Sequence, residues 1–166
     1  MNIARSLKWR PATTAILICG LVALLIYSVV VYMVAHFQPT VEVRIGSGIY
    51  HVQIADTEAE RQQGLSEVSE LKPDGGLLMK FDGDGAWGIW MKDMKIPIDI
   101  VWMDKDKKVV YVVKNASPEL STNTIFTPKS SARYVLELPA GSVDKAGIKA
   151  GVVADFDEFA TGELGR

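Results

Sequence analysis

Residues 12–38 contain no Asp, Glu, Lys or Arg, and this uncharged stretch constrains the fold more than any other feature of the sequence. Within it, residues 15–37 form an apolar run of 23 residues that is rich in Leu, Ile and Val. A hydrocarbon layer of about 30 Å is crossed by about 20 helical residues, whereas the apolar part of a cleaved signal peptide has only about 7–15. We therefore expect residues 12–37 to form a transmembrane helix that anchors the chain.

Basic residues near the amino terminus predict the orientation of this helix. Arg5, Lys8 and Arg10 precede the uncharged stretch, while the first acidic residue is Glu42. An excess of Lys and Arg marks the cytoplasmic side of a membrane span. We expect a single-pass protein of the cell membrane. Its parts should be a cytoplasmic tail (residues 1–11), the span (12–37), an extracytoplasmic domain (40–160) and a flexible tail (161–166).

The part of the chain after the anchor is expected to form one domain that holds no metal, cofactor or disulfide. Its length suits one compact hydrophobic core and is short for two. It carries 15 basic and 20 acidic residues, a net charge of −5, which argues against a nucleic-acid groove. Cys19 lies inside the anchor, and His51 is the only histidine of the domain, so the usual ligands of a transition metal are missing from the sequence.

Alternating apolar and polar residues predict that strands dominate this domain. Residues 41–45 and 49–55 should form a hairpin, because Gly46-Ser47-Gly48 between them tolerates positive φ. Thr57 and Glu60 have the spacing of a capping box, which predicts a short helix that ends before Gly64. Ser142 is expected to cap a second helix, and turns are expected at residues 73–76 and 82–85. Further strands are predicted at residues 77–81, 86–91, 98–103, 109–113, 134–138 and 152–159.

These elements predict an α+β domain that is mainly β. Strands that are neighbours in the sequence can pair as antiparallel hairpins, so we expect a small antiparallel barrel or sandwich with one or two short helices, preceded by the transmembrane helix. Residues 115–129 are the least regular part of the domain and are rich in Ser, Thr, Asn and Pro. They are either a mobile surface connection or a lid over a site.

Charged residues within apolar strands are the main candidates for a functional site. Asp99 alternates with Val101 and Met103, and Glu137 stands between Leu136 and Leu138. A carboxylate in a strand covered on both faces needs a cation or backbone donors. The candidate cations are Lys92, Arg61 and Arg133. The whole set is either a structural ion-pair network or a binding or catalytic site.

The Asp-Gly-Asp-Gly run at residues 82–85 also invites a calcium interpretation, which its surroundings oppose. An EF-hand loop needs an oxygen ligand where Ala86 stands and a turn-forming glycine where Trp87 stands. We therefore expect a plain turn and no metal.

Four segments occur in one order at close spacing, namely Arg-Gln-Gln-Gly-Leu-Ser at 61–66, Gly-Gly-Leu-Leu-Met-Lys-Phe at 75–81, Trp-Met-Lys-Asp-Met-Lys-Ile-Pro-Ile-Asp-Ile at 90–100 and Tyr-Val-Leu-Glu-Leu-Pro-Ala-Gly at 134–141. Over about residues 43–156 this pattern resembles the family of the domain of unknown function 192. The family usually has Asn-Thr where this chain has Asp93-Met94. The resemblance implies a compact β-rich fold and frequent export or membrane anchoring, and it implies no assigned activity.

Three functions follow as hypotheses. The leading one is a non-enzymatic module, tethered outside the membrane, that binds a small ligand or another envelope protein around Trp90, Lys92 and Asp99, with Arg133 and Glu137 as further candidates. The second is a hydrolase that uses Asp99 and Glu137 as a carboxylate pair, which requires the two groups to lie about 5–10 Å apart in a cleft. The third is a structural scaffold of an envelope complex, whose loop at residues 115–129 touches a membrane partner.

Overall fold

The computed structural model describes residues 11–36, 40–120 and 124–157. The chain divides into two compact units, Met1–Gln38 and Pro39–Arg166, each of which is described by itself. The expected tail at residues 161–166 and most of the expected cytoplasmic tail at 1–11 lie outside the described residues.

The first unit contains one helix, α1 (Pro11–His36). Proline suits the first turn of a helix, where its missing N–H would have no intrahelical acceptor. Residues Thr14–Tyr32 of α1 have the length and apolar composition needed to cross a membrane. A membrane anchor and a signal sequence share these properties, so the membrane location and the orientation of α1 stay predictions.

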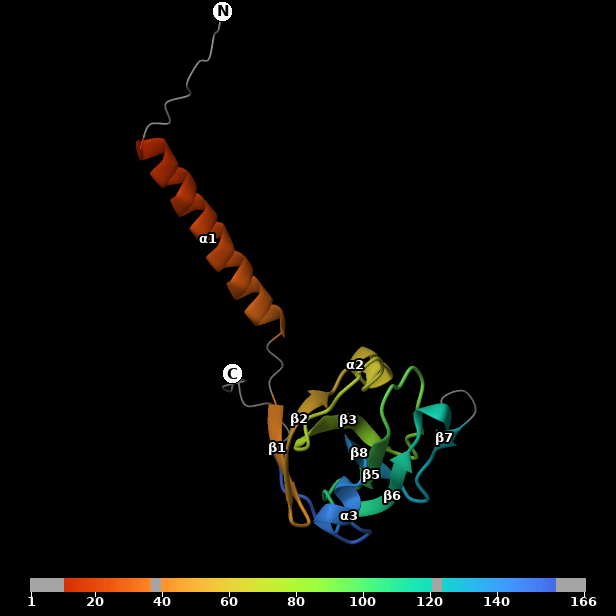
Figure 1. Ribbon diagram of the computed structural model, residues 1–166. Coiled ribbons are helices and arrows are strands. Elements are labelled where there is room, and N and C mark those ends of the chain that lie inside the picture. Colours follow the sequence, from red (N-terminus) through yellow and green to blue (C-terminus); the bar gives the residue numbers. More distant parts are fainter. Residues whose placement is uncertain (1–10, 37–39, 121–123, 158–166) are drawn as a thin grey trace, which may run out of the picture. The chain divides into compact units, whose positions relative to one another are not determined.

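The second unit is built on a mixed six-stranded sheet (Figure 1). Its strands follow the spatial order β1-β2-β3-β8-β5-β6. They span β1 (Thr40–Ile45), β2 (Gly48–Ala55), β3 (Gly75–Gly85), β8 (Ala132–Pro139), β5 (Ile98–Met103) and β6 (Val109–Ala116). A second, two-stranded sheet pairs β4 (Ile89–Trp90) with β7 (Ile125–Phe126). The predicted α+β, mainly β fold class is confirmed.

Two details of the expected architecture were wrong. The sheet is not wholly antiparallel, because β2 and β3 pair in parallel, with His51 opposite Gly75. A parallel pair needs a long crossover, and here the chain between the two strands contains α2 (Glu58–Gln63). Nor does the sheet close into a barrel, since β1 and β6 do not pair with each other.

The carboxy-terminal segment at residues 151–156 lies against both edge strands. It makes isolated bridges from Asp155 to Arg44 of β1 and from Val153 to Lys108 beside β6. The expected strand at residues 152–159 is therefore reduced to two single bridges, and its last two residues lie outside the described part of the chain. The segment covers part of each edge without joining the sheet as a full strand.

Helix α2 begins as its sequence predicts. The side chain of Thr57 accepts the amide of Glu60 at 3.2 Å, and the Glu60 carboxylate accepts the amide of Thr57 at 3.0 Å. Gly64 ends the helix with a φ of 51°, in the left-handed range that glycine tolerates.

The second short helix, α3 (Ser142–Ala146), differs from its prediction at the start. Its amino-terminal cap is Gly141, which makes no side-chain hydrogen bond, and Ser142 is buried inside the helix. The expected turn at residues 82–85 is also different, because β3 continues through it to Gly85 with a register shift after Lys80. The expected strand at residues 86–91 is reduced to β4.

The sheet buries apolar side chains on both faces. The first core lies on the face that α3 and the carboxy-terminal segment cover, and it includes Leu136 and Leu138 of β8 with Val143 and Phe156. The second core lies on the other face, under Ile89 and Leu65, and includes Val135, Ile100 and Trp102. Every residue of β5 is buried for this reason, so its sequence is an almost continuous apolar run.

Two glycines of β3 provide a matched test of this packing. A Cβ on Gly76 would lie 2.4 Å from the carbonyl oxygen of Glu137, whereas a Cβ on Gly83 would meet nothing within 4 Å. We expect Gly76→Ala to lower the free energy of unfolding by about 1–3 kcal/mol, because β3 and β8 must separate to make room. Gly83→Ala should change it by less than about 1 kcal/mol. Urea unfolding of the full chain in maltoside micelles, followed by tryptophan fluorescence, measures both; equal effects would contradict the close approach.

Candidate functional site

A pocket of about 350 Å³ opens at the edge of the second core, beside the end of α2. Its walls come from α2 and the turn at residues 64–66, from Met79 and Phe81 of β3, and from residues 87–90. Glu137 of β8 also lines it. The pocket is therefore assembled from segments that lie far apart in the sequence.

Hydrogen bonds hold the walls of the pocket in place. The Trp102 indole, fully buried in β5, donates to the carbonyl of Trp87 at 2.8 Å and fixes that segment against the sheet. On the opposite side, the Ser66 hydroxyl donates to the carbonyl of Lys92 at 2.9 Å, and the amide of Glu67 donates to the carbonyl of Asp93 at 2.9 Å. The turn after α2 is thereby tied to the segment that carries Trp90.

Aromatic rings form one wall. The rings of Phe81 and Trp87 stack with their centroids 4.3 Å apart and their planes 7° from parallel. The Arg61 guanidinium lies 5.0 Å from the Phe81 centroid and donates to the carbonyls of Asp56 and Lys80, which fixes α2 against β3. Trp90 also lines the pocket, with 48% of its surface exposed.

Two polar atoms of the pocket lining are buried without a hydrogen-bond partner among the described residues, the Trp87 indole nitrogen and Oε2 of Glu137. Glu137 is only 3% exposed. Burial raises the pKa of its carboxyl from 4.5 to about 8, so the group holds its proton at neutral pH. A Cβ on Gly64 would lie 3.9 Å from Oε2, which places this oxygen near the end of α2. A buried polar atom without a partner destabilises the fold by about 1–3 kcal/mol unless something else supplies the bond.

Asp99 is buried as completely as Glu137, but both of its carboxylate oxygens accept hydrogen bonds. Its two carboxylate oxygens accept the amides of Asn115 and Val143, each at 2.8 Å. Val143 lies in the first turn of α3, so Asp99 supplies the cap that Gly141 lacks, from a strand of the sheet. Asp99 thus joins β5, the end of β6 and α3, and its backbone donors take the place of the expected cations.

The sheet register separates the two buried carboxyl groups. Asp99 lies opposite Leu138, while Ile100 lies opposite Glu137. Residues directly opposite each other share a face, so Asp99 points to the first core and Glu137 to the second. The predicted Asp99/Glu137 carboxylate pair is therefore wrong, because the sheet stands between the two groups.

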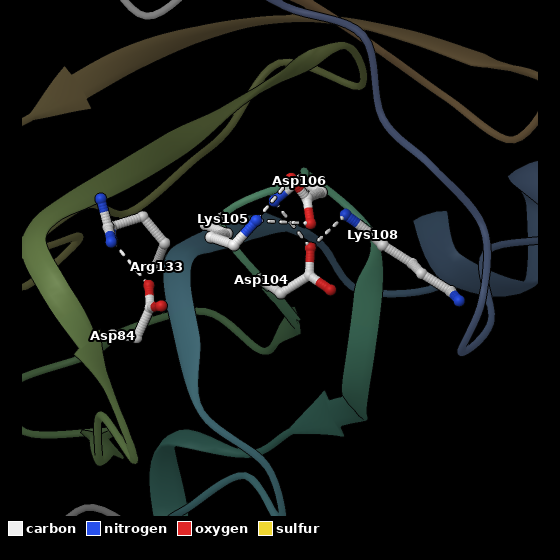
Figure 2. Close-up of polar contacts among 6 residues, drawn as sticks. All are labelled: Asp84, Asp104, Lys105, Asp106, Lys108 and Arg133. Atoms are coloured by element: carbon white, nitrogen blue, oxygen red, sulfur yellow. Dashed lines mark hydrogen bonds and ion pairs between the residues drawn. The ribbon is translucent and has the colours of Figure 1, made fainter.

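The remaining predicted site residues lie outside the pocket. The Lys92 ammonium is 5.7 Å from the centroid of the Trp90 ring, beside the rim. Arg133 donates through Nε to Asp84 at 2.8 Å (Figure 2). Figure 2 also shows the tip of the β5–β6 hairpin, where the Asp104 carboxylate accepts the amides of Asp106 and Lys108 at 2.9 Å each.

Of the five candidates, only Trp90 and Glu137 line the pocket. Sequence reasoning missed Phe81, Trp87 and Met79, which are among its apolar lining residues. The available signal was an aromatic residue on each side of the acidic 82–85 run. Across residues 11–36, 40–120 and 124–157, no group of three or more His, Cys, Asp or Glu side chains is placed to hold a metal ion.

The role assigned to Asp99 has a direct test. We expect Asp99→Ala to lower the free energy of unfolding by about 2–5 kcal/mol, because two buried amides lose their acceptor and a cavity remains. Asp84→Ala, which removes the partly exposed partner of Arg133, should lower it by no more than about 1 kcal/mol. Urea unfolding of both full-length variants measures the difference; an Asp99→Ala variant as stable as Asp84→Ala would contradict the capping role.

The raised pKa of Glu137 predicts how stability changes with pH. The unfolded carboxyl loses its proton near pH 4.5, while the folded one holds it to about pH 8. Between these values the folded state binds more protons, so this group's contribution to stability falls as pH rises, by up to about 1.4 kcal/mol per pH unit. Unfolding measured from pH 5 to 9 should show this fall in the wild type and in Glu70→Gln, an exposed control, but not in Glu137→Gln. If the stability of Glu137→Gln fell with pH as steeply as that of the wild type, the raised pKa of Glu137 would be contradicted.

Comparison with known proteins places the chain in a family. Residues 41–156 match the model of the domain of unknown function 192, described as an uncharacterized ACR. A UPF0127 protein of Thermococcus gammatolerans is 31% identical over 110 residues, which cover 64% of this chain and 67% of the relative. A UPF0127 protein of Thermococcus kodakarensis is 28% identical over 100 residues, which cover 60% of each chain.

Solved structures share the fold. A crystal structure of a proposed transcription regulator from Sinorhizobium meliloti 1021 superposes with a TM-score of 0.67 at 27% identity, covering 73% of this chain and 97% of that one. A protein of unknown function from Novosphingobium aromaticivorans DSM 12444 gives a TM-score of 0.65 at 25% identity, covering 69% and 83% of the two chains. The chain therefore belongs to the family of the domain of unknown function 192.

Proposed function

We propose that the second unit is a non-enzymatic module that binds a small molecule in the pocket beside α2. The observation that carries this proposal is the Glu137 carboxyl, a buried group that lines a pocket of about 350 Å³ with an oxygen that has no partner among the described residues. Binding pockets combine apolar walls with a few placed polar groups. A ligand that bonds to Oε2 would supply the missing partner.

The rest of the lining has the same character. Leu65, Met79, Ile89 and Met94 provide apolar surface, and the stacked Phe81 and Trp87 rings provide flat faces. Two hydrogen bonds between the turn after α2 and residues 92–93 hold the walls in position without a ligand. A rigid pocket of this kind binds with little loss of conformational entropy.

The lining supports binding more than catalysis. Ser66 is a possible nucleophile, but its hydroxyl donates to the carbonyl of Lys92 rather than to a base. Nucleophilic catalysis needs a base within hydrogen-bonding distance of the nucleophile. The sequence suggested Asp99 as the catalytic partner of Glu137, but Asp99 lies on the other face of the sheet and accepts hydrogen bonds from two backbone amides.

The proposal places this pocket outside the cell membrane. Support comes from the length and apolar composition of Thr14–Tyr32 and from the basic residues that precede α1. A module tethered in this way meets ligands of the envelope, or presents them to a neighbouring envelope protein.

The proposal is tested by a screen of small neutral and charged compounds against the full chain in maltoside micelles. Compounds that bind should raise the unfolding temperature of the wild type, because a ligand that binds only the folded state stabilises it. We expect Trp90→Ala to weaken binding at least tenfold, since this ring lines the pocket and is half exposed.

Ile125→Ala is the matched control, because Ile125 lies opposite Trp90 in the β4–β7 pair but does not line the pocket. It should keep wild-type affinity. The proposal fails if no compound binds, or if the hits bind Trp90→Ala as tightly as the wild type.

A further inference from the structure

The ionisable side chains of the pocket are mainly acidic. Glu58 of α2, Asp82 of β3 and Glu137 of β8 line it, while Arg61 is the basic residue among the described lining. The Arg61 guanidinium already donates to two backbone carbonyls and lies over the Phe81 ring. These contacts hold α2 against β3, and because the described lining has three acidic residues and one basic residue, its formal charge is negative.

The aromatic rings favour the same kind of ligand. The face of a tryptophan or phenylalanine ring is electron-rich and attracts cations, and quaternary ammonium groups are bound by such rings in many proteins. Trp90 shows this property within the chain, because the Lys92 ammonium lies 5.7 Å from its centroid. Trp87 adds a further ring to the lining, whereas Phe81 is already covered by the stacked Trp87 ring and by the Arg61 guanidinium.

We propose that the ligand of this pocket carries an organic ammonium group, which lies against the aromatic rings and forms an ion pair with the carboxylate of Glu137. This inference rests on the proposed binding function. It explains why an acidic side chain, rather than a neutral one, occupies a buried position with an unpartnered oxygen. A cation is the partner that best offsets the burial of a carboxylate.

Binding of a cation changes the protonation of Glu137. The free carboxyl is protonated at pH 7, because burial raises its pKa to about 8. When the ammonium group enters, the carboxyl releases its proton to solvent, and the ligand keeps all of its own bonds. Glu58, Arg61 and Asp82 are the other ionisable groups of the lining. The part of the pH dependence that belongs to Glu137 is the part that is lost in Glu137→Gln.

The experiment uses calorimetric titration of the full chain in maltoside micelles with choline and with benzyltrimethylammonium. The neutral control is 3,3-dimethyl-1-butanol, in which carbon replaces the choline nitrogen. We expect both cations to bind at least tenfold more tightly than the alcohol at pH 9. Their affinity should rise about tenfold from pH 6 to pH 7 and level off above pH 8, because only the ionised fraction of Glu137 is competent to bind. Nearly one proton per ligand should be released at pH 7.

Two variants test whether the Glu137 carboxyl is the group that binds the cation. Glu137→Gln should remain folded at pH 7, lose the pH dependence and bind the cations at least tenfold more weakly at pH 9. Glu70→Gln makes the same substitution at an exposed residue outside the pocket and should behave as the wild type.

The outcomes separate this inference from the function on which it rests. If neutral compounds bind at the pocket and lose affinity in Trp90→Ala, but neither cation binds more tightly than the alcohol, the ammonium proposal is overturned and the binding function stands. If neither cations nor neutral compounds bind, both are overturned. Cation binding that is unchanged in Glu137→Gln also overturns the ion pair.

Discussion

Packing against both faces of β5 and β8 is the constraint on which the rest of the domain depends. These two strands lie side by side in the sheet, and every residue of β5 is buried. Coverage of one face requires α3 and the carboxy-terminal segment, while coverage of the other requires the turn after α2 and the small β4–β7 sheet. The helices, the second sheet and the pocket are consequences of hiding two faces at once.

Because both faces of these strands are buried, each polar side chain in them needs a hydrogen-bond partner inside the domain. Asp99 and Glu137 occupy adjacent strands and are buried to the same degree, yet only Asp99 has its oxygens satisfied by the protein. The amide bonds to Asp99 link three elements of the first core, which is a structural task. Glu137 performs no such task among the described residues, and this contrast is the reason for assigning function to its face of the sheet.

Local patterns in the sequence predicted local structure well. The β1–β2 hairpin, the capping box of α2 and the full extent of β5 follow from residues close together in the chain. Asp93 suits its position for a local reason too, because its φ of 55° lies in the left-handed region that Asn and Asp tolerate best.

Features set by distant contacts could not be predicted in the same way. The parallel pairing of β2 with β3 depends on where the crossover packs, which alternation of side chains does not encode. Ser142 looked like a cap because its residue type suits that position, but the acceptor came from Asp99, far away in the sequence. The pocket needed the stack of Phe81 on Trp87, and although both aromatic residues flank the acidic 82–85 run, that position alone does not tell that their rings stack.

The carboxy-terminal segment affects the order in which the edges of the sheet can be covered during synthesis of the chain. Its bridges to Arg44 and Lys108 cover parts of the two outermost strands, and unpaired strand edges are templates for aggregation. These bridges join residues 153 and 155 to strands that precede them in the chain, so a growing chain cannot form them before these two residues have been added. Until then both edges lack this cover, and their unpaired backbone groups can pair with another chain.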